Sequence, residues 1–143
     1  MPAESKKTNA PTDPWVETLR LTHGGDRSFA HLVETQVLAA APAALPALET
    51  KLVAILEAPE ATEAAREFAC RLLATAGGAA CVPALVPLLR NPRLSHYARL
   101  ALEPNPAPAA GDALRVAAQA LPAGVLRKGV FGSLAARAAH GLP

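Results

Sequence analysis

The apolar residues of this 143-residue chain fall into short stretches with helical spacing, and a proline or a pair of glycines ends almost every stretch. In one such stretch Phe29, Leu32, Val33 and Val37 recur every three or four residues, as on one face of a helix, before Pro42 ends the run. No stretch shows the strict alternation of a half-buried strand. The pattern therefore predicts an all-α fold of short helices joined by tight turns.

Eight helices are expected, over residues 14–21, 28–41, 45–57, 62–76, 82–90, 94–103, 112–121 and 125–140. Hydrophobic residues make up 51% of the chain but aromatic residues only 3%, so the apolar content is Ala, Leu and Val, of which Ala and Leu are strong helix formers. Asp13 and Pro14 form a typical helix start. Pro87 lies inside a predicted helix, which it should kink or shorten because it lacks a backbone N–H group.

The sequence also repeats itself. Leu45-Pro46-Ala47-Leu48 returns 37 residues later as Val82-Pro83-Ala84-Leu85, and Ala65-Arg66 returns 33 residues later as Ala98-Arg99. One unit thus consists of a helix A with the pattern xPALxxLL, a short turn, and a helix B with the pattern ARxxAxxxL. A single helical hairpin cannot bury its apolar stripe, whereas three or more stacked hairpins can.

These units resemble HEAT repeats, through residues 82–89 in helix A and residues 65–73 in helix B. Residues 91–104 (NPRLSHYARLALEP) are also similar to a segment common in bacterial HEAT-repeat proteins. The resemblance implies a right-handed α–α solenoid of about three HEAT-like hairpins with an N-terminal helical cap. In the third helix B, Phe131 stands where the repeat has Arg, so that unit departs from the pattern.

The expected organisation is a disordered tail over residues 1–12 and a single HEAT-like domain over residues 13–143. The domain would consist of N-terminal helices (13–41), repeat 1 (43–77), repeat 2 (80–104) and repeat 3 (109–140). Trp15 lies before the repeats, where it would anchor a cap over the open end or, alternatively, be exposed for binding. Because residues 140–143 resemble a turn into another helix A, we expect the natural protein to continue beyond them.

The charge argues against a nucleic-acid binder. Fourteen basic and twelve acidic residues give a net charge of +2, and Lys6-Lys7 and Arg127-Lys128 are the only basic clusters. No run approaches the length of a membrane span, and no apolar core of a secretory signal follows the N-terminus. These features favour a cytoplasmic protein. Cys70 and Cys81 are interpreted as small buried residues, with a disulfide or metal site as the alternative.

No catalytic motif is present, and His23, His31, His96 and His140 are scattered without carboxylates at motif spacing. We therefore expect no enzyme activity, no cofactor and no metal. HEAT arrays generally bind proteins, so the first hypothesis is a monomeric scaffold that holds another protein on its concave helix-B face. The alternative is an accessory module of a larger enzyme, as in bilin lyases, which the repeats also resemble, or beside a downstream catalytic domain.

Four residues are candidates for partner binding: Arg66, His96, Tyr97 and Arg99. Arg66 and Arg99 occupy the same place in successive B helices, where they could face an acidic partner. The alternative is that each arginine bonds to a neighbouring turn or repeat, since a guanidinium makes several directed hydrogen bonds. Tyr and Arg are common at interface hot spots, which suggests Tyr97 and Arg99 as a contact pair, although Tyr97 could instead pack against the next repeat.

Overall fold

A computed structural model describes residues 12–143, and every regular element in this range is a helix. The predicted all-α class is therefore confirmed. The predicted tail and the Lys6-Lys7 cluster lie outside the described residues, apart from Thr12. The elements are α1 (Pro14–Thr18), α2 (Ser28–Leu38), η1 (Pro42–Ala44), α3 (Leu45–Glu57), α4 (Glu63–Ala76), η2 (Ala79–Cys81), α5 (Val82–Leu85), η3 (Val86–Arg90), α6 (Ser95–Leu102), α7 (Pro108–Ala120) and α8 (Val125–Ala139), where η denotes a 3-10 helix.

The local signals at helix starts and at Pro87 behave as predicted. The Asp13 side chain accepts a hydrogen bond from the backbone N–H of Trp15 at 2.9 Å, which caps α1. The Thr62 hydroxyl accepts one from Ala65 N–H at 3.0 Å and caps α4. At Pro87 the α-helix gives way to a 3-10 helix, so the second helix A is a single α-turn followed by η3.

Three predicted helix ends are wrong. Helix α1 ends at Thr18, because the carbonyls of Leu19 and Leu21 turn away to accept hydrogen bonds from Thr62 at the start of α4. Helix α2 ends at Leu38, three residues before the predicted end, and Ala41 is already extended. Helix α7 begins at Pro108 and not at Asp112, because Pro108 occupies the first helical position after an extended Ala107.

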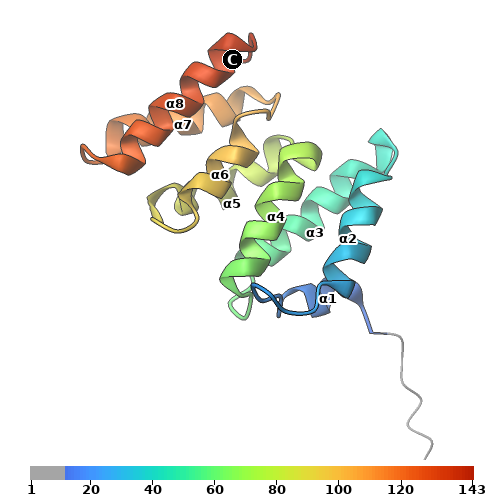
Figure 1. Ribbon diagram of the computed structural model, residues 1–143. Helices are drawn as coiled ribbons and strands as arrows, with labels where there is room; N and C mark the ends of the chain where they lie inside the picture. Colours follow the sequence, from blue (N-terminus) through green and yellow to red (C-terminus); the bar gives the residue numbers. More distant parts are fainter. Residues whose placement is uncertain (1–11) are drawn as a thin grey trace, which may run out of the picture.

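The helices form two layers that follow the order of the sequence (Figure 1). We call α2, α4, α6 and α8 the B layer, in which α2 contacts α4, α4 contacts α6, and α6 contacts α8. We call α3, α5 and α7 the A layer, in which each helix also contacts the next. Helices α3 and α4, and likewise α7 and α8, pack against each other across the layers, while α1 packs on α2 at one end.

The core lies between the layers and is built from Leu, Val and Ala side chains. Ala65 and Ala69 of α4, together with Ala98 and Ala101 of α6, are completely buried. Because an alanine side chain is a single methyl group, α4 and α6 can approach closely along this seam. The high alanine content of the sequence thus shapes the contact between neighbouring B helices.

Buried polar side chains join the successive helix pairs. Glu49 of α3 accepts hydrogen bonds from the backbone N–H groups of Gly78 and Cys81 at 2.8 and 2.9 Å. Asn105, before α7, donates to the Gly78 carbonyl at 2.9 Å. Arg137 of α8 donates to the carbonyls of Leu102 and Asn105 at 2.7 and 2.6 Å. We call Glu49, Asn105 and Arg137 the polar ladder; each is at most 6% exposed.

The polar ladder predicts a large effect of Asn105→Ala. The Asn105 side chain also accepts a hydrogen bond from Ala107 N–H at 2.9 Å, so its removal leaves that donor without a partner and the Gly78 carbonyl with only the weak bond from the Cys81 thiol. We expect the free energy of unfolding to fall by about 2–3 kcal/mol, as for the loss of a buried hydrogen-bonded pair. Urea denaturation measures this change. The exposed Gln119→Ala is the control, and equal stability of the two variants would contradict the prediction.

Candidate protein-binding surface

All four predicted binding residues lie on the B layer. Arg66 is in the first turn of α4, and His96, Tyr97 and Arg99 are on α6. His96 is exposed, while the other three are partly buried. The structure therefore brings three of them together on one helix and places Arg66 on the helix beside it.

Arg66 is held by its own hairpin. Its Nη2 atom donates to the carbonyl of Ala58, in the turn between α3 and α4, at 2.9 Å. This bond ties the start of α4 to the end of α3. It has the geometry expected if Arg66 supports the fold.

Arg99 reaches the next helix of its layer. Its Nη1 atom donates to the Gly129 carbonyl at 3.1 Å and to the Ser133 hydroxyl at 3.3 Å, both on α8. Ser133 in turn donates to Glu103 at 2.7 Å, so α6 and α8 are joined at two points. A Cβ atom on Gly129 would lie 2.7 Å from the Arg99 guanidinium carbon, so any larger residue there would displace the guanidinium from this position.

His96 and Tyr97 form a small aromatic cluster with Arg71 of α4. The two rings meet edge to face with their centroids 5.5 Å apart, and the Arg71 guanidinium lies 5.4 Å from the Tyr97 centroid. Arg71 and His96 are both exposed. Tyrosine and arginine are the residue types most often found at interface hot spots, so this cluster offers a contact surface.

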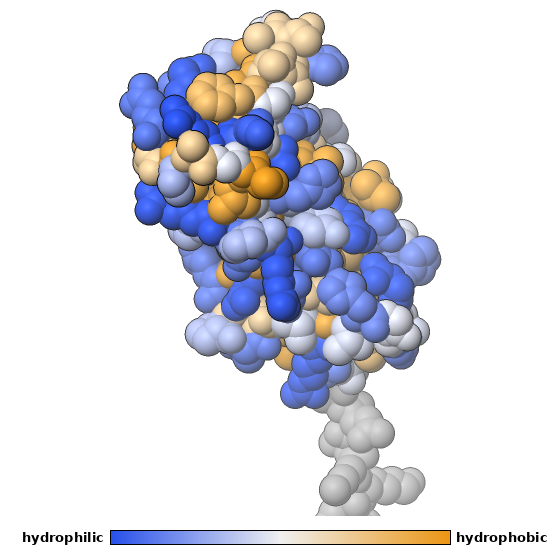
Figure 2. Space-filling view, turned by 60° about the vertical axis from the view of Figure 1, so that its left-hand side comes forward, coloured by the Kyte–Doolittle hydropathy of each residue, from blue (hydrophilic) through white to orange (hydrophobic). Residues whose placement is uncertain are grey.

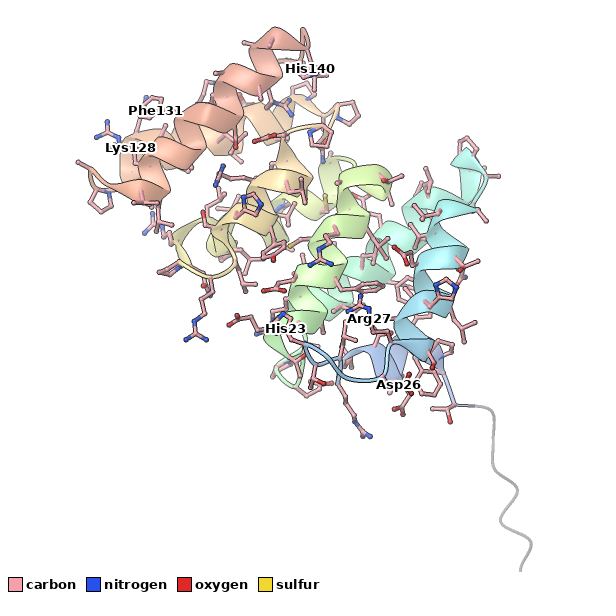
Figure 3. The ribbon with its side chains drawn as sticks, viewed as in Figure 1. His23, Asp26, Arg27, Lys128, Phe131 and His140 are labelled. Carbon is pink, nitrogen blue, oxygen red and sulfur yellow. The ribbon has the colours of Figure 1, made fainter. Side chains whose placement is uncertain are left out.

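A hollow of about 480 Å³ opens on the same layer, where α4, α6 and the end of α8 meet. Its wall is mainly apolar, with the Glu103 carboxylate and the His140 ring as polar groups. Figure 3 shows His140 near the C-terminal end of α8. The lining residues are Ala74, Leu100, Glu103, Pro104, Ala136, His140 and Leu142.

Leu100, Glu103 and Ala136 are not among the residues predicted from the sequence to bind a partner. The one available signal is that Leu100 lies between the buried Ala98 and Ala101, so helical periodicity directs it away from the core. That Ala74 and Ala136 lie opposite Leu100 is known only once α4, α6 and α8 are placed side by side.

Trp15 packs within the N-terminal helices. Its indole N–H donates to Gln36 of α2 at 3.0 Å, and the Lys51 ammonium of α3 lies 5.2 Å from its ring centroid. The ring is partly buried against the core. Trp15 thus joins α1 to α2 and α3, which is the geometry expected of a cap anchor.

Cys70 and Cys81 are free thiols, and both are completely buried. Burial raises the pKa of each thiol to about 12; the nearby Cys81 adds to the shift of Cys70, and the Glu49 carboxylate adds to that of Cys81. Both groups are therefore protonated at neutral pH. Since the thiolate is the nucleophilic form, neither cysteine is activated for catalysis.

Comparison of the chain with models of protein families, with curated proteins and with solved structures finds no match. Within residues 12–143, no helix is long and apolar enough to cross a bilayer. Over the same range, no three His, Cys, Asp or Glu side chains come together in a group able to hold a metal ion.

The geometry of Arg99 predicts that Arg99→Lys destabilises the chain. A lysine side chain ends one atom short of the Nη1 position from which Arg99 bonds both Gly129 and Ser133, so its ammonium cannot make the same two bonds. We expect the free energy of unfolding to fall by about 1–2 kcal/mol, since two partly buried hydrogen bonds to a charged group are lost. Thermal or urea denaturation measures the change. Arg90→Lys, at an exposed arginine, is the matched control and should remain within about 0.5 kcal/mol of the native chain.

The raised thiol pKa values predict slow alkylation of the folded protein. At pH 7.5, iodoacetamide should leave Cys70 and Cys81 unmodified over a time in which both react completely in denaturant. Because both pKa values lie above the usual 9.0, the folded state holds these protons more tightly than the unfolded state. The free energy of unfolding should consequently fall as the pH rises from about 9 towards 12. Mass spectrometry gives the extent of labelling, and rapid labelling of the folded chain would contradict the assigned burial.

Proposed function

We propose that this chain is a HEAT-like solenoid of about three hairpins that acts as a non-catalytic scaffold and binds another protein along its B layer. The observation that carries the proposal is the coincidence of two features on one layer. The hollow lined by Leu100 and Ala136 lies beside the cluster of Arg71, His96 and Tyr97. The B layer therefore offers an apolar recess next to a partly aromatic, cationic surface.

The arrangement of the helices supports the solenoid part of the proposal. Helix pairs joined by short turns follow one another in space, and each contacts its neighbours in the sequence (Figure 1). Arg66 and Arg99 both join their B helices to neighbouring elements, which favours the structural role for these two residues. Partner contacts then fall to Tyr97, His96 and the exposed wall of the hollow.

The hollow also suggests how a partner would be held. An apolar side chain entering it would leave water against Leu100, Pro104 and Ala136, at a gain of about 25 cal/mol per Å² of apolar surface buried. Polar groups at the edge of the recess would fix the orientation of the partner. A central apolar anchor with a polar rim is the usual anatomy of a protein interface.

A pair of matched variants tests the proposal. Leu100→Asp places a charge in the hollow, whereas Val116→Asp places the same charge on an exposed valine of the A layer. With the immobilised chain as bait in a lysate of its source cells, Leu100→Asp and Tyr97→Ala should each lower the recovery of the bound partner about tenfold or more, as expected for loss of an interface anchor. Val116→Asp should leave the recovery unchanged.

Two results would contradict the proposed function. One is a bound partner whose recovery falls equally with Leu100→Asp and Val116→Asp, which would remove the claim for the B layer. The other is the absence of any protein retained by the native chain and lost from the Leu100→Asp chain. Circular dichroism of every variant should match that of the native chain, so that a lost contact is not confused with unfolding.

A further inference from the structure

Charge is divided unevenly along the row of helices. Residues 12–60 carry seven acidic and three basic side chains, whereas residues 61–143 carry four acidic and nine basic side chains. The first segment forms α1 to α3 and the second forms α4 to α8, so the two charges lie towards opposite ends of the molecule (Figure 1). The small net charge of the whole chain conceals this division.

Most of these charges are at the surface. Glu49 is the only buried acidic residue of the first segment, and Arg137 is the only fully buried basic residue of the second. Surface ion pairs compensate two of the basic residues, Arg93 with Glu63 at 3.5 Å and Arg115 with Asp112 at 2.7 Å. The charges of Arg127 and Lys128, at the start of α8, have no ion-pair partner among residues 12–143.

Exposed apolar side chains gather at the same two ends. Val16, Leu32 and Leu38 lie on α1 and α2, and Val125 and Phe131 lie on α8. These five side chains are 51–85% exposed. Val116 of α7 is also exposed but lines a hollow with Val86 on the A layer, and Val86 and Leu100 of the middle helices are only 39% and 38% exposed. Figure 2 shows apolar surface gathered in the upper part of the molecule, where the C-terminal helices lie.

Each end thus combines apolar surface with a net charge of one sign, although Arg20, Arg27 and Lys51 also lie in the acidic segment. At the C-terminal end, a shallow hollow of about 200 Å³ is lined by Arg127, Lys128 and Phe131 at the turn before α8 and its first turns. The Arg127 guanidinium lies 5.5 Å from the Phe131 ring centroid. At the N-terminal end, the exposed valine and leucines lie on helices that also carry Asp13, Glu17 and Glu34. Figure 3 shows Lys128 and Phe131 at the opposite end of the molecule from Asp26.

We propose that the chain associates head to tail with a second copy of itself, through contact of the basic, apolar C-terminal end with the acidic, apolar N-terminal end of the next copy. We call Val125, Arg127, Lys128 and Phe131 the C-end patch, and Asp13, Val16, Leu32, Glu34 and Leu38 the N-end patch. Opposite potentials on two apolar patches favour their encounter and fix their orientation. Because each chain carries both complementary patches, a second copy of the chain is a suitable partner.

Such a contact is heterologous, because each copy offers two different surfaces. Unless the rotation between copies closes a ring, each dimer retains one free patch of each kind and can add further copies. Self-association differs from the monomer expected from the sequence. The net charge shows neither where the charges lie nor which apolar residues are exposed at each end. The head-to-tail contact uses surfaces other than the hollow on the B layer and stands apart from the proposed function.

Sedimentation velocity of the purified chain over a range of concentrations tests the inference. The native chain should form larger species as its concentration rises. Raising the salt from about 50 mM to 500 mM should weaken this association several-fold, since salt screens attraction between exposed charges. A native chain that remains monomeric up to about 1 mM would overturn the inference, because a specific contact weaker than this carries only about 4 kcal/mol.

Two variants with altered charge, one at each end, test whether the C-end patch of one copy contacts the N-end patch of the next. The C-end variant carries Lys128→Glu and Phe131→Glu, and the N-end variant carries Leu32→Lys and Leu38→Lys. Each alone should self-associate about tenfold or more weakly than the native chain, because a like charge opposes the other patch. An equimolar mixture of the two should recover association, since each variant keeps one native patch and these two patches are complementary.

Other outcomes would contradict the head-to-tail contact. If the N-end variant alone associates like the native chain, the contact does not use the N-end patch. If Val86→Lys, the control in the middle of the molecule, weakens association as much as the end variants, the ends are not the contact surfaces. Val125→Glu, at the most exposed apolar residue of the C-end patch, replaces the C-end variant should that double substitution alter the circular dichroism.

Discussion

The backbone groups at the turns between helix pairs need hydrogen-bond partners, and the arrangement of the whole row of helices depends on the side chains that supply them. Where such a group is shielded from water, leaving its N–H or C=O unpaired would cost about 1–3 kcal/mol. Glu49, Asn105 and Arg137 supply the partners from side chains of the adjoining elements. Each bond fixes the position of one helix pair relative to the next. The polar ladder therefore both pairs backbone groups and specifies how the helix pairs are placed, which apolar packing alone leaves loosely specified.

The secondary structure was largely predictable because its signals are local. Helical spacing of Leu and Ala, prolines between segments and the cap at Asp13 all act within a few residues. Pro87 shortened its helix for the same reason. The early start of α7 at Pro108 was missed because closely spaced prolines indicate a loop, whereas the last of them occupies the first helical position. The polar ladder was missed because Glu49 and Asn105 are ordinary surface residue types until the fold brings buried backbone groups to them.

The candidate site shows the same division between local and long-range information. Arg66 and Arg99, which the proposed repeat makes equivalent, differ in their partners: one bonds to the turn before its helix and the other reaches α8. The sequence pattern therefore does not predict what a side chain contacts. Phe131, which stands where the proposed repeat has Arg, is half exposed. The hollow on the B layer combines single residues from three helices and has no signature in any one of them.

The single α-turn of α5, followed by the 3-10 helix η3, has a mechanical consequence. A 3-10 helix has poorer hydrogen-bond geometry than an α-helix and is seldom stable over more than a few residues. The middle helix pair therefore has a less regular segment, η3, on the A layer and a regular α-helix, α6, on the B layer. A row of this kind does not bend uniformly. We therefore expect bending along the row of helices to concentrate at η3.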